Sequence, residues 1–165
     1  NLVNEFSSFA RMPSPIFKKI EINLVVKRAI DFYKMSSLNI LTLRTAGKKF
    51  NIKGDEDQLY RVFINLIKNS EDAIYEKRQK NINFKGIISV EIEHNNDYIT
   101  ITLTDNGPGI KDTAKIMTPY FTTKKDGTGL GLPIVSKIIN EHSGDIVVTN
   151  NNPGVKIFIT IPKII

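Results

Sequence analysis

The sequence predicts an α+β fold, a two-layer α/β sandwich in which helices cover one face of a mixed, mostly antiparallel sheet. Apolar residues recur at helical spacing from Leu59 to Ile74, whereas residues 87–93 and 98–104 alternate between apolar and polar side chains as paired strands do. Strands and helices do not alternate regularly enough for a doubly wound nucleotide-binding fold. The 165 residues, of which 41% are hydrophobic and 24% charged, suit one compact domain.

The first residues are expected to be the end of a helix followed by a linker. Apolar residues lie there at helical spacing: Leu2, Val3, Phe6 and Phe9. Pro13 and Pro15 end this helix, because proline lacks an amide donor and disfavours helix in the residue before it. We therefore expect residues 1–15 to be a helix end with its linker and residues 16–165 to be the domain proper. The chain has no initiator Met, so we expect a piece of a longer protein.

The first half of the domain should contain three strands and two helices. A strand over residues 19–22 is followed by a helix that Asn23 would cap, and strands near residues 40–45 and 50–53 come next. Asp55 and Gln58 have the spacing of a capping box that opens the long helix. The buried face of the long helix is predicted to hold Leu59, Val62, Phe63, Leu66, Ile67, Ser70 and Ile74.

The second half should begin with an antiparallel hairpin, whose strands are joined by residues 94–97. A helix from about residue 130 to 141 stops at Ser143-Gly144, since glycine readily ends a helix. Two closing strands, 145–149 and 155–161, surround a turn of asparagines, proline and glycine.

Composition narrows the function only in part. A net charge of +6 suits a polyanionic partner, such as nucleic acid, an anionic membrane surface or a nucleotide, and does not choose among them. The absence of cysteine excludes disulfides and thiolate metal sites. No apolar stretch is long enough to cross a bilayer, and no targeting signal is present, so we expect a cytoplasmic domain whose whole protein could still be anchored in the inner membrane.

Three motifs carry possible chemistry. Asn65 and Asn69 lie four residues apart on one helix face, where an amide oxygen could bind a metal. In residues 105–109, Asp-Asn-Gly-Pro-Gly, a carboxylate at a strand end precedes two glycines that allow a ligand to approach the backbone. In residues 127–132, Gly-Thr-Gly-Leu-Gly-Leu, glycines precede a helix whose first amides could bind an anion. Each motif alone also has an ordinary structural explanation, as a solvated face, a turn or a linker.

Taken together, these motifs resemble the N, G1, F and G2 boxes of the histidine kinase catalytic domain in the GHKL superfamily, with residues 119–124, Pro-Tyr-Phe-Thr-Thr-Lys, as the F box. The superfamily also includes type II topoisomerases, MutL and heat-shock chaperone ATPases. The resemblance covers the chain from about Ile20 onward. Residues 3–13 are similar to the helix that joins the dimerisation domain to the catalytic domain in NtrY-like, nitrogen-regulation-type kinases.

The resemblance implies the Bergerat ATP-binding fold, with ATP and Mg²⁺ as cofactors. It implies that Asn69, assisted by Asn65, coordinates the metal and that Asp105 recognises the adenine amino group. Gly107 and Gly109 would shape the floor of the site, and Phe121 would anchor a lid over residues 110–126 that is mobile without ligand. The remaining expected ATP contacts are Thr122, Thr123, Lys124, Gly127, Thr128, Gly129, Leu130, Gly131 and Leu132.

Two positions depart from the family pattern. Many ATPases of the superfamily carry a glutamate at the position of Asn65, where it activates water, and an amide cannot act as a base. The site is therefore expected to hold ATP without rapid hydrolysis, which suits transfer to a histidine. Asp72 stands where many histidine kinases have a basic or neutral residue facing the phosphates, and it could face solvent instead.

No catalytic residue is expected in this chain: the histidine that would accept the phosphoryl group and its neighbouring acidic base are expected upstream of residue 1. His94 and His142 lack the expected sequence setting and are interpreted as structural. The implied partners are a histidine-bearing dimerisation domain of the same kinase and a response regulator, with no nucleic acid. The chain itself is expected to be a monomer and the whole kinase a homodimer. Two alternatives stay open: a non-kinase ATPase that clamps DNA or protein, and a degenerate nucleotide-binding scaffold.

Overall fold

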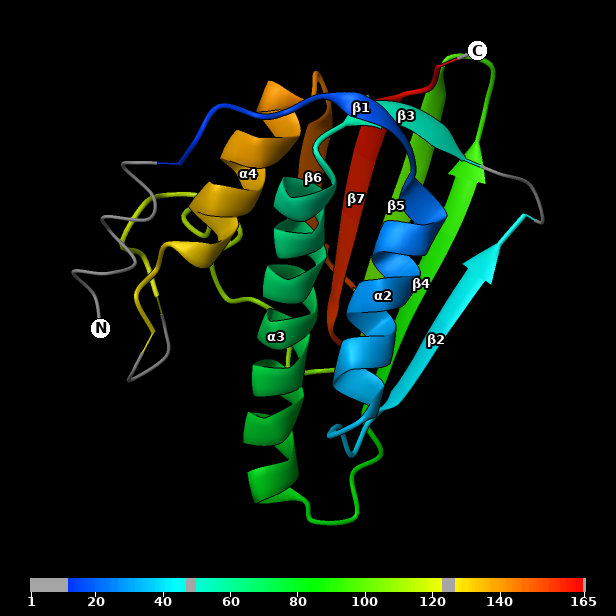
Figure 1. Ribbon diagram of the computed structural model, residues 1–165. Helices are drawn as coiled ribbons and strands as arrows, with labels where there is room; N and C mark the ends of the chain where they lie inside the picture. Colours follow the sequence, from blue (N-terminus) through cyan, green and yellow to red (C-terminus); the bar gives the residue numbers. More distant parts are fainter. Residues whose placement is uncertain (1–11, 47–49, 123–126, 165) are drawn as a thin grey trace.

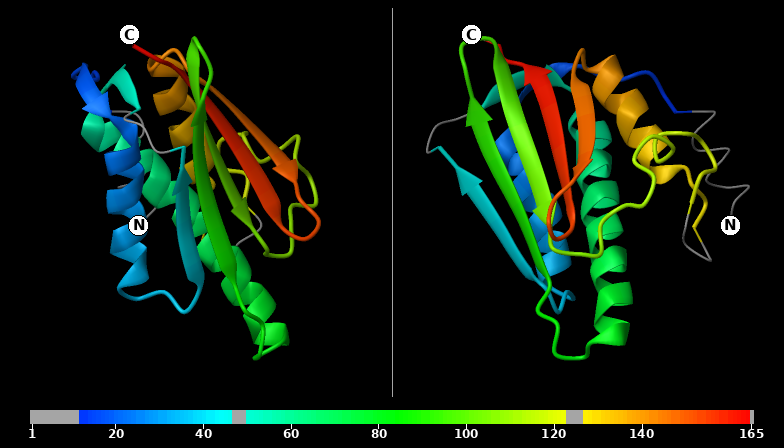
Figure 2. Two further views of the ribbon diagram at one scale, coloured as in Figure 1. Left: turned by 90° about the vertical axis from the view of Figure 1, so that its right-hand side faces the viewer. Right: turned by 180° about the vertical axis from the view of Figure 1, so that it is seen from behind.

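The structure, a computed structural model, describes residues 12–46, 50–122 and 127–164. Helices α2, α3 and α4 cover one face of a five-stranded sheet (Figures 1 and 2). The elements are β1 (Lys18–Glu21), α2 (Ile22–Lys34), β2 (Ile40–Thr45), β3 (Asn51–Gly54), α3 (Glu56–Lys80), β4 (Ile87–His94), β5 (Tyr98–Asp105), α4 (Gly131–Glu141), β6 (Asp145–Asn150) and β7 (Val155–Pro162). The predicted α+β class is confirmed.

The large sheet has the strand order β2-β4-β5-β7-β6. β2 pairs parallel with β4, and the other pairs are antiparallel. β1 and β3 form a separate two-stranded ribbon. β5 lies between β4 and β7, and its last residue, Asp105, pairs with Ile88 of β4 and accepts a hydrogen bond from the amide of Val155, the first residue of β7. This position places a carboxylate in the interior.

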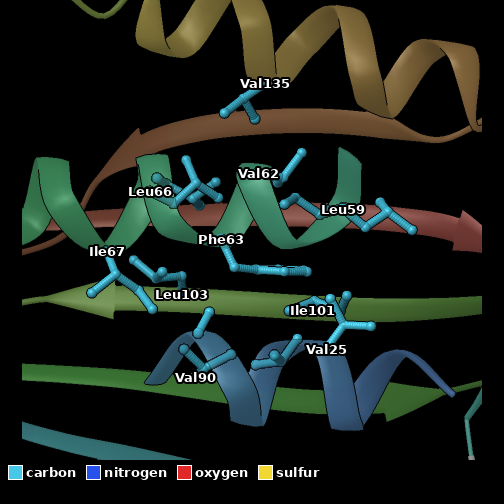
Figure 3. Packing of buried hydrophobic residues seen from close by; sticks show 14 of the residues in the cluster. Val25, Leu59, Val62, Phe63, Leu66, Ile67, Val90, Ile101, Leu103 and Val135 are labelled. Atoms are coloured by element: carbon cyan, nitrogen blue, oxygen red, sulfur yellow. The ribbon is translucent and has the colours of Figure 1, made fainter. Parts of the chain in front are cut away.

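The core lies between the helices and the covered face of the sheet. Val25 of α2, Phe63 of α3 and Val135 of α4 meet strand residues such as Leu103 (Figure 3). The predicted buried face of α3 is confirmed at every position named above. Each fully buried aliphatic or aromatic side chain stabilises the fold by about 1.5–3 kcal/mol, so this face fixes the rotation of α3. Its remaining face is thereby free to carry polar residues.

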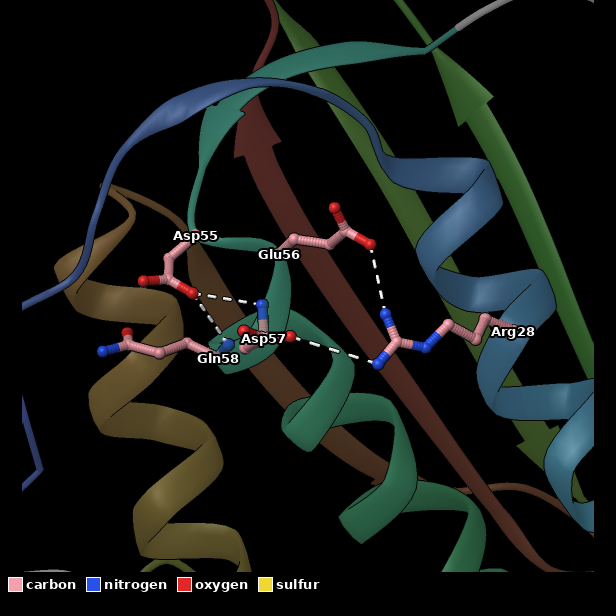
Figure 4. Close-up of polar contacts among 5 residues, drawn as sticks. All are labelled: Arg28, Asp55, Glu56, Asp57 and Gln58. Carbon is pink, nitrogen blue, oxygen red and sulfur yellow. Dashed lines mark hydrogen bonds and ion pairs between the residues drawn. The ribbon is translucent and has the colours of Figure 1, made fainter.

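Asp55 caps the N-terminus of α3, as predicted. Its Oδ1 accepts hydrogen bonds from the backbone amides of Asp57 at 3.1 Å and Gln58 at 3.0 Å (Figure 4). The reciprocal contact of a capping box is absent among these residues, because the amide of Asp55 donates to His142 Nε2 at 2.9 Å. Gln58 Nε2 instead donates to the carbonyl of Pro13 at 2.9 Å. One of the two hydrogen bonds of the predicted capping box is therefore replaced by contacts with residues far away in the sequence.

The prediction that Asn23 caps α2 is wrong. α2 begins at Ile22 with Glu21 as its N-cap, and Asn23 lies in the first turn. Glu21 pairs with Asn51 in the β1–β3 ribbon, so the extended backbone continues to the residue before the helix. Asn23 bridges instead: its Nδ2 donates to Glu21 Oε1 at 2.9 Å and its Oδ1 accepts from the amide of Phe50 at 3.4 Å.

His142 is structural, as expected. It is buried after the end of α4, where Nδ1 donates to the Ile138 carbonyl at 2.7 Å and Nε2 accepts from Asp55. His94 is the last residue of β4, and the centroid of its ring lies 5.4 Å from that of the Phe50 ring. The predicted helix end over residues 1–11 lies outside the described residues, so the boundary at residue 15 stays a prediction. Within the described part of the chain, no helix combines the length and apolarity needed to span a bilayer.

Candidate functional site

One stripe of α3 organises the candidate site. Asn65, Asn69, Ala73 and Lys77 follow one another at intervals of four residues, so each lies about 6 Å further along the helix. The buried stripe of α3 packs on the sheet, and these four residues are all partly exposed beside it. The two asparagines lie beside the start of α4, and Ala73 and Lys77 lie beside the loop that follows β5. The stripe therefore connects the predicted site residues at the start of α4 with those in the loop after β5.

Asp105 is 5% exposed, and its carboxylate is held from three directions. Oδ2 accepts a hydrogen bond from Ser70 Oγ of α3 at 2.9 Å. Oδ1 accepts from the backbone amide of Gly107 at 2.9 Å and from that of Val155 at 3.3 Å. A carboxylate oxygen accepts about two hydrogen bonds, so Oδ2 keeps one acceptor position for a donor such as an exocyclic amine.

Burial raises the pKa of Asp105 above its ordinary value, and the hydrogen bonds from Gly107, Ser70 and Val155 together with the positive charge of Lys77 oppose this rise. A buried carboxylate with a raised pKa is typical of functional sites, although structural networks also produce one. Here the group has both a raised pKa and an acceptor position left over. Asp105 therefore resembles a recognition residue more than a structural one.

The loop after Asp105 depends on glycine at two points. Gly107 lies so close to Asp105 and Ala73 that a Cβ there would be 3.0 Å from Asp105 Oδ1 and 3.3 Å from Ala73 Cβ. Gly109 has φ +83°, a conformation that residues with side chains rarely adopt. Asn150, at the end of β6, accepts from the amide of Ile110 at 2.7 Å and donates to its carbonyl at 2.8 Å. The loop is thus fixed on both sides of Gly109.

The other group of residues gathers at the start of α4. The helix begins at Gly131 after the N-cap Leu130, and no side chain caps it. The Gly131 and Leu132 amides belong to the first turn, which has no acceptor within its own helix, and Pro133 has no amide hydrogen. A Cβ at Gly131 would lie 3.7 Å from Asn65 Oδ1 and 3.8 Å from Asn69 Nδ2. Two carboxamides and an uncapped helix N-terminus therefore face the same space.

The Asn65 carboxamide has a fixed orientation. Its Nδ2 donates to the Arg61 carbonyl at 2.9 Å, so Oδ1 is the atom directed toward Gly131. Carboxamide oxygens are ligands that Mg²⁺ accepts, usually together with phosphate oxygens and water. Asn69 presents Nδ2 to Gly131 in this conformation, and a half-turn of its carboxamide places Oδ1 there. The metal-binding role of both residues stays a prediction.

The segment before α4 is joined to the glycine-rich turn by backbone contacts. The amide of Tyr120 donates to the Gly129 carbonyl at 3.0 Å, and that of Phe121 donates to the Thr118 carbonyl at 3.2 Å. Gly129 has φ +68°, and a Cβ there would be 2.4 Å from the Tyr120 carbonyl carbon. Phe121 is partly buried, whereas Thr122 is exposed. Leu130 is fully buried, and Gly127 and Thr128 are half-buried. Thr123 and Lys124 lie outside the described residues.

Asp72 lies on α3 and forms an ion pair with Lys68, whose Nζ is 3.0 Å from Asp72 Oδ2. The Asp72 side chain is partly exposed. Since this pair spans one helical turn at the surface, it contributes only about 0.3–0.5 kcal/mol. The ion pair agrees with the interpretation that Asp72 faces solvent.

The sequence did not single out several residues that build the site. Ser70 was predicted only as part of the buried face of α3, and Lys77 was not predicted to have a role in the site. Asn150 and Gly154 were predicted only as turn residues. A polar side chain such as Ser70 within an otherwise apolar stripe is the one signal that could have suggested a buried polar contact. The others act through contacts with residues far away in the sequence.

Comparison with known proteins identifies the family. Residues 54–165 match the family of histidine kinase-, DNA gyrase B- and HSP90-like ATPases. A protein described as an NtrY-like sensor histidine kinase from Rickettsia conorii is 37% identical over 153 residues, which cover 91% of this chain and 24% of the relative. The sensor histidine kinase ZraS of Salmonella typhimurium is 43% identical over 153 residues, which cover 89% of this chain and 31% of the relative. The chain thus spans about a quarter to a third of the length of these relatives.

Solved structures show the same fold. The nucleotide-free catalytic domain of the histidine kinase ThkA superposes with a TM-score of 0.78 at 27% identity, covering 90% of this chain and 98% of that chain. ThkA in complex with the response regulator TrrA gives a TM-score of 0.80 at 25% identity, covering 99% of this chain and 46% of that chain.

Proposed function

Because this chain belongs to the family of histidine kinase-, DNA gyrase B- and HSP90-like ATPases, we propose that it binds ATP with Mg²⁺ along α3 and acts as the catalytic domain of a sensor histidine kinase. The family that the sequence resembles is thereby confirmed, and the likeness to NtrY-like and ZraS kinases supports the kinase branch. The site roles given below are part of the proposal.

The observation that carries the proposal is that two groups of residues, at two points along α3, complement the two ends of ATP. At one end, Asp105 keeps an acceptor position for the adenine amino group. At the other end, the amides of Gly131 and Leu132 and the carboxamides of Asn65 and Asn69 suit the phosphates. ATP likewise has a hydrogen-bonding base at one end and a polyanion at the other. The residues along this one helix therefore suit both the base and the phosphates of ATP.

Asn69 and Asn65 would hold Mg²⁺ together with phosphate oxygens. The metal would neutralise charge on the phosphates and orient the terminal phosphoryl group. The residues of this chain bind and position the nucleotide: Asp105 fixes the base, and the first turn of α4 fixes the phosphate chain. The carboxylate of Glu71, the acidic residue after Ser70, is occupied elsewhere. It accepts hydrogen bonds from Ser37 Oγ and Asn39 Nδ2, on the side of α3 toward β2.

The proposed reaction transfers the terminal phosphoryl group of ATP to a histidine nitrogen of a dimerisation domain. The bond from the γ-phosphorus to the β–γ bridging oxygen breaks, a phosphorus–nitrogen bond forms, and ADP leaves. The proton that the imidazole ring loses would pass to the acidic base expected beside that histidine. Catalysis by positioning and charge neutralisation suits this reaction. The carboxamide of Asn65 cannot take a proton from water, so the bound nucleotide is preserved for the histidine.

The partners follow from the proposed kinase role. A dimerisation domain of the same kinase would present the histidine, and a response regulator would receive the phosphoryl group. The structural neighbour ThkA, a histidine kinase, was solved in complex with the response regulator TrrA. We propose no nucleic-acid partner, a monomeric state for this domain and a homodimer for the whole kinase. The domain would work on the cytoplasmic side, whether or not the whole protein is anchored in the inner membrane.

A clamp-type ATPase is the second candidate, because gyrase-like and HSP90-like ATPases belong to the same family. The net charge of +6 would favour a DNA clamp over other clamps. Such an enzyme needs a base near the terminal phosphate, and Asn65 provides none. The kinase is therefore the better-supported of the two.

The test is calorimetric titration of MgATP into the wild-type chain and into Asp105→Ala, with ATP hydrolysis followed in parallel. The matched control is Asp97→Ala, which removes an exposed carboxylate from the β4–β5 hairpin turn. We expect binding to depend on Mg²⁺, to be lost in Asp105→Ala and to be unchanged in Asp97→Ala. A histidine-bearing dimerisation domain of an NtrY-like kinase, added in trans, should become phosphorylated.

Each contrary result has a distinct meaning. Absence of MgATP binding to the wild-type chain would overturn the nucleotide site. Rapid turnover of ATP by the chain alone would favour the clamp-type ATPase. Binding that is equally strong in Asp105→Ala would overturn the role of Asp105 while leaving the phosphate end intact.

A further inference from the structure

Lys77 connects three parts of the chain at the Asp105 end of the site. It lies half-buried on α3, and its Nζ donates to the carbonyl of Asn106 at 2.8 Å and to that of Gly107 at 3.2 Å. The same ammonium group lies 4.3 Å from the centre of the Phe84 ring, in the segment that leads to β4. An ammonium group over an aromatic face is favourable, more so when it is shielded from water. Lys77 is therefore held in place rather than extended into solvent.

The two carbonyls that Lys77 contacts belong to the two residues directly after Asp105. The amide of Gly107 is the donor that binds Asp105 Oδ1. We propose that Lys77 is a positioning residue of the adenine end, whose ammonium group holds the Asp105–Gly107 loop in the conformation that receives the base. This inference rests on the proposed function, and it adds a residue that neither composition nor motif spacing identifies.

The positive charge of Lys77 also affects the protonation of Asp105. Burial raises the pKa of Asp105, and the positive charge of Lys77 acts with the hydrogen bonds from Gly107, Ser70 and Val155 to lower it. Lys77 thereby favours the ionised carboxylate, which accepts a hydrogen bond from an amino group. Adenine presents an amino group where guanine presents a carbonyl oxygen, which a carboxylate repels. Lys77 is thus expected to improve the preference for adenine over guanine.

The loop has further anchors, so loss of Lys77 should loosen it without unfolding it. Asn106 Oδ1 accepts from the amide of Ile87 at 2.9 Å, and Asn106 Nδ2 donates to the Lys85 carbonyl at 2.9 Å. On the other side, Asn150 binds both backbone groups of Ile110. These contacts do not involve Lys77. Variants at this position should therefore fold.

The first test uses the ligand-free chain. Carbon-13 NMR of the Asp105 carboxyl group gives its titration, and hydrogen exchange gives the protection of the Gly107 amide. In Lys77→Met we expect a higher pKa of Asp105 and at least about tenfold faster exchange at Gly107, because both hydrogen bonds from the ammonium group to the loop are lost. Lys77→Arg should restore both values, and the control Lys80→Met, at an exposed position of the same helix, should change neither.

The second test measures MgATP and MgGTP binding by calorimetry, with urea unfolding of each variant. Lys77→Met should weaken MgATP binding by about tenfold and narrow the preference for ATP over GTP, most strongly at low pH. Unchanged Asp105 titration and Gly107 protection would overturn the proposal. It would also be overturned if ATP and GTP binding fell equally and in proportion to lost stability, since that indicates a general structural role. If the wild-type chain bound no MgATP, the proposed function would fail, and the ligand-free test would still decide whether Lys77 positions the loop.

Discussion

The backbone of Gly154 lies directly against the carbonyl of Asp105. A Cβ at Gly154 would be 1.9 Å from Asp105 O and 2.6 Å from the carbonyl carbon. Gly154 also has φ +96°, and the next residue, Val155, donates its amide to Asp105 Oδ1 at 3.3 Å. The turn between β6 and β7 therefore forms one wall of the site at the end of β5.

Gly154→Ala should destabilise the fold and abolish MgATP binding. The added methyl group cannot fit, and the backbone conformation disfavours any side chain, so we expect a loss of about 3 kcal/mol or more in the free energy of unfolding. Urea unfolding measures this loss. A variant as stable as the wild type would show that the turn can move away from Asp105, which contradicts the close approach seen here.

Gly131→Ala should weaken MgATP binding without destabilising the fold. Gly131 is the first residue of α4, its φ is not positive, and the nearest atoms to an added Cβ are 3.7 and 3.8 Å away, on Asn65 and Asn69. Alanine is a better helix former than glycine, by up to about 1 kcal/mol, so stability should be equal or higher. The methyl group would occupy space beside the predicted phosphate position, so MgATP should bind at least about tenfold more weakly. Unchanged affinity measured by calorimetry would place the phosphates elsewhere.

Asp105→Asn should separate stability from binding. Because the pKa of Asp105 is raised by burial, its contribution to stability is present below the ordinary value of 3.8 and is lost as pH rises through the raised pKa. A neutral asparagine avoids this loss at pH 7. Its oxygen must stay with the amides of Gly107 and Val155, so its NH₂ group replaces Oδ2 beside Ser70.

We therefore expect Asp105→Asn to unfold in urea with a free energy equal to or above that of the wild type at pH 7. MgATP binding should be lost, because a donor then meets the adenine amino group. A stability loss of more than about 1 kcal/mol would mean that the charge itself strengthens the hydrogen bonds enough to outweigh its burial. Retained affinity would show that Oδ2 is not the atom that contacts the base.

Asp55→Ala should weaken the fold in a pH-dependent way. Burial raises the pKa of Asp55, but the hydrogen bonds from the amides of Gln58, Ile16 and Asp57 outweigh it, so the pKa is lowered from 3.8. The contribution of the carboxylate to stability is therefore present above pH 3.8 and is lost as pH falls through the lowered pKa. Replacing the cap with alanine should cost about 1–2 kcal/mol at pH 7.

The check on this prediction is urea unfolding across a pH series. The difference between wild type and Asp55→Ala should shrink below pH 3.8. Asp55→Asn, which keeps a capping oxygen without the charge, should retain most of the stability at pH 7 and show a weaker dependence on pH. A constant difference at every pH would mean that the carboxylate is not the source of the effect.

The elements of the fold followed from short-range patterns. The buried face of α3 could be predicted because apolar residues repeat at the helical period, and the β4–β5 hairpin because its strands alternate. The cap at Asp55 involves amides only two and three residues away. Asn23 failed as a cap because the pairing of Glu21 with Asn51, thirty residues further on, fixed where the helix starts.

The candidate site was predictable where its residues lie within motifs, and not where distant segments meet. The sequence by itself determined that Asn65 and Asn69 share a helix face, and that glycines surround Asp105 and precede α4. Only the tertiary structure decided that Ser70 and Lys77 reach the Asp105 loop, that Asn150 holds Ile110 and that Gly154 lies against Asp105. The physical reason is that periodicity and capping act within a few residues, whereas these contacts depend on how β5, β6 and β7 pair and on how α3 packs across them.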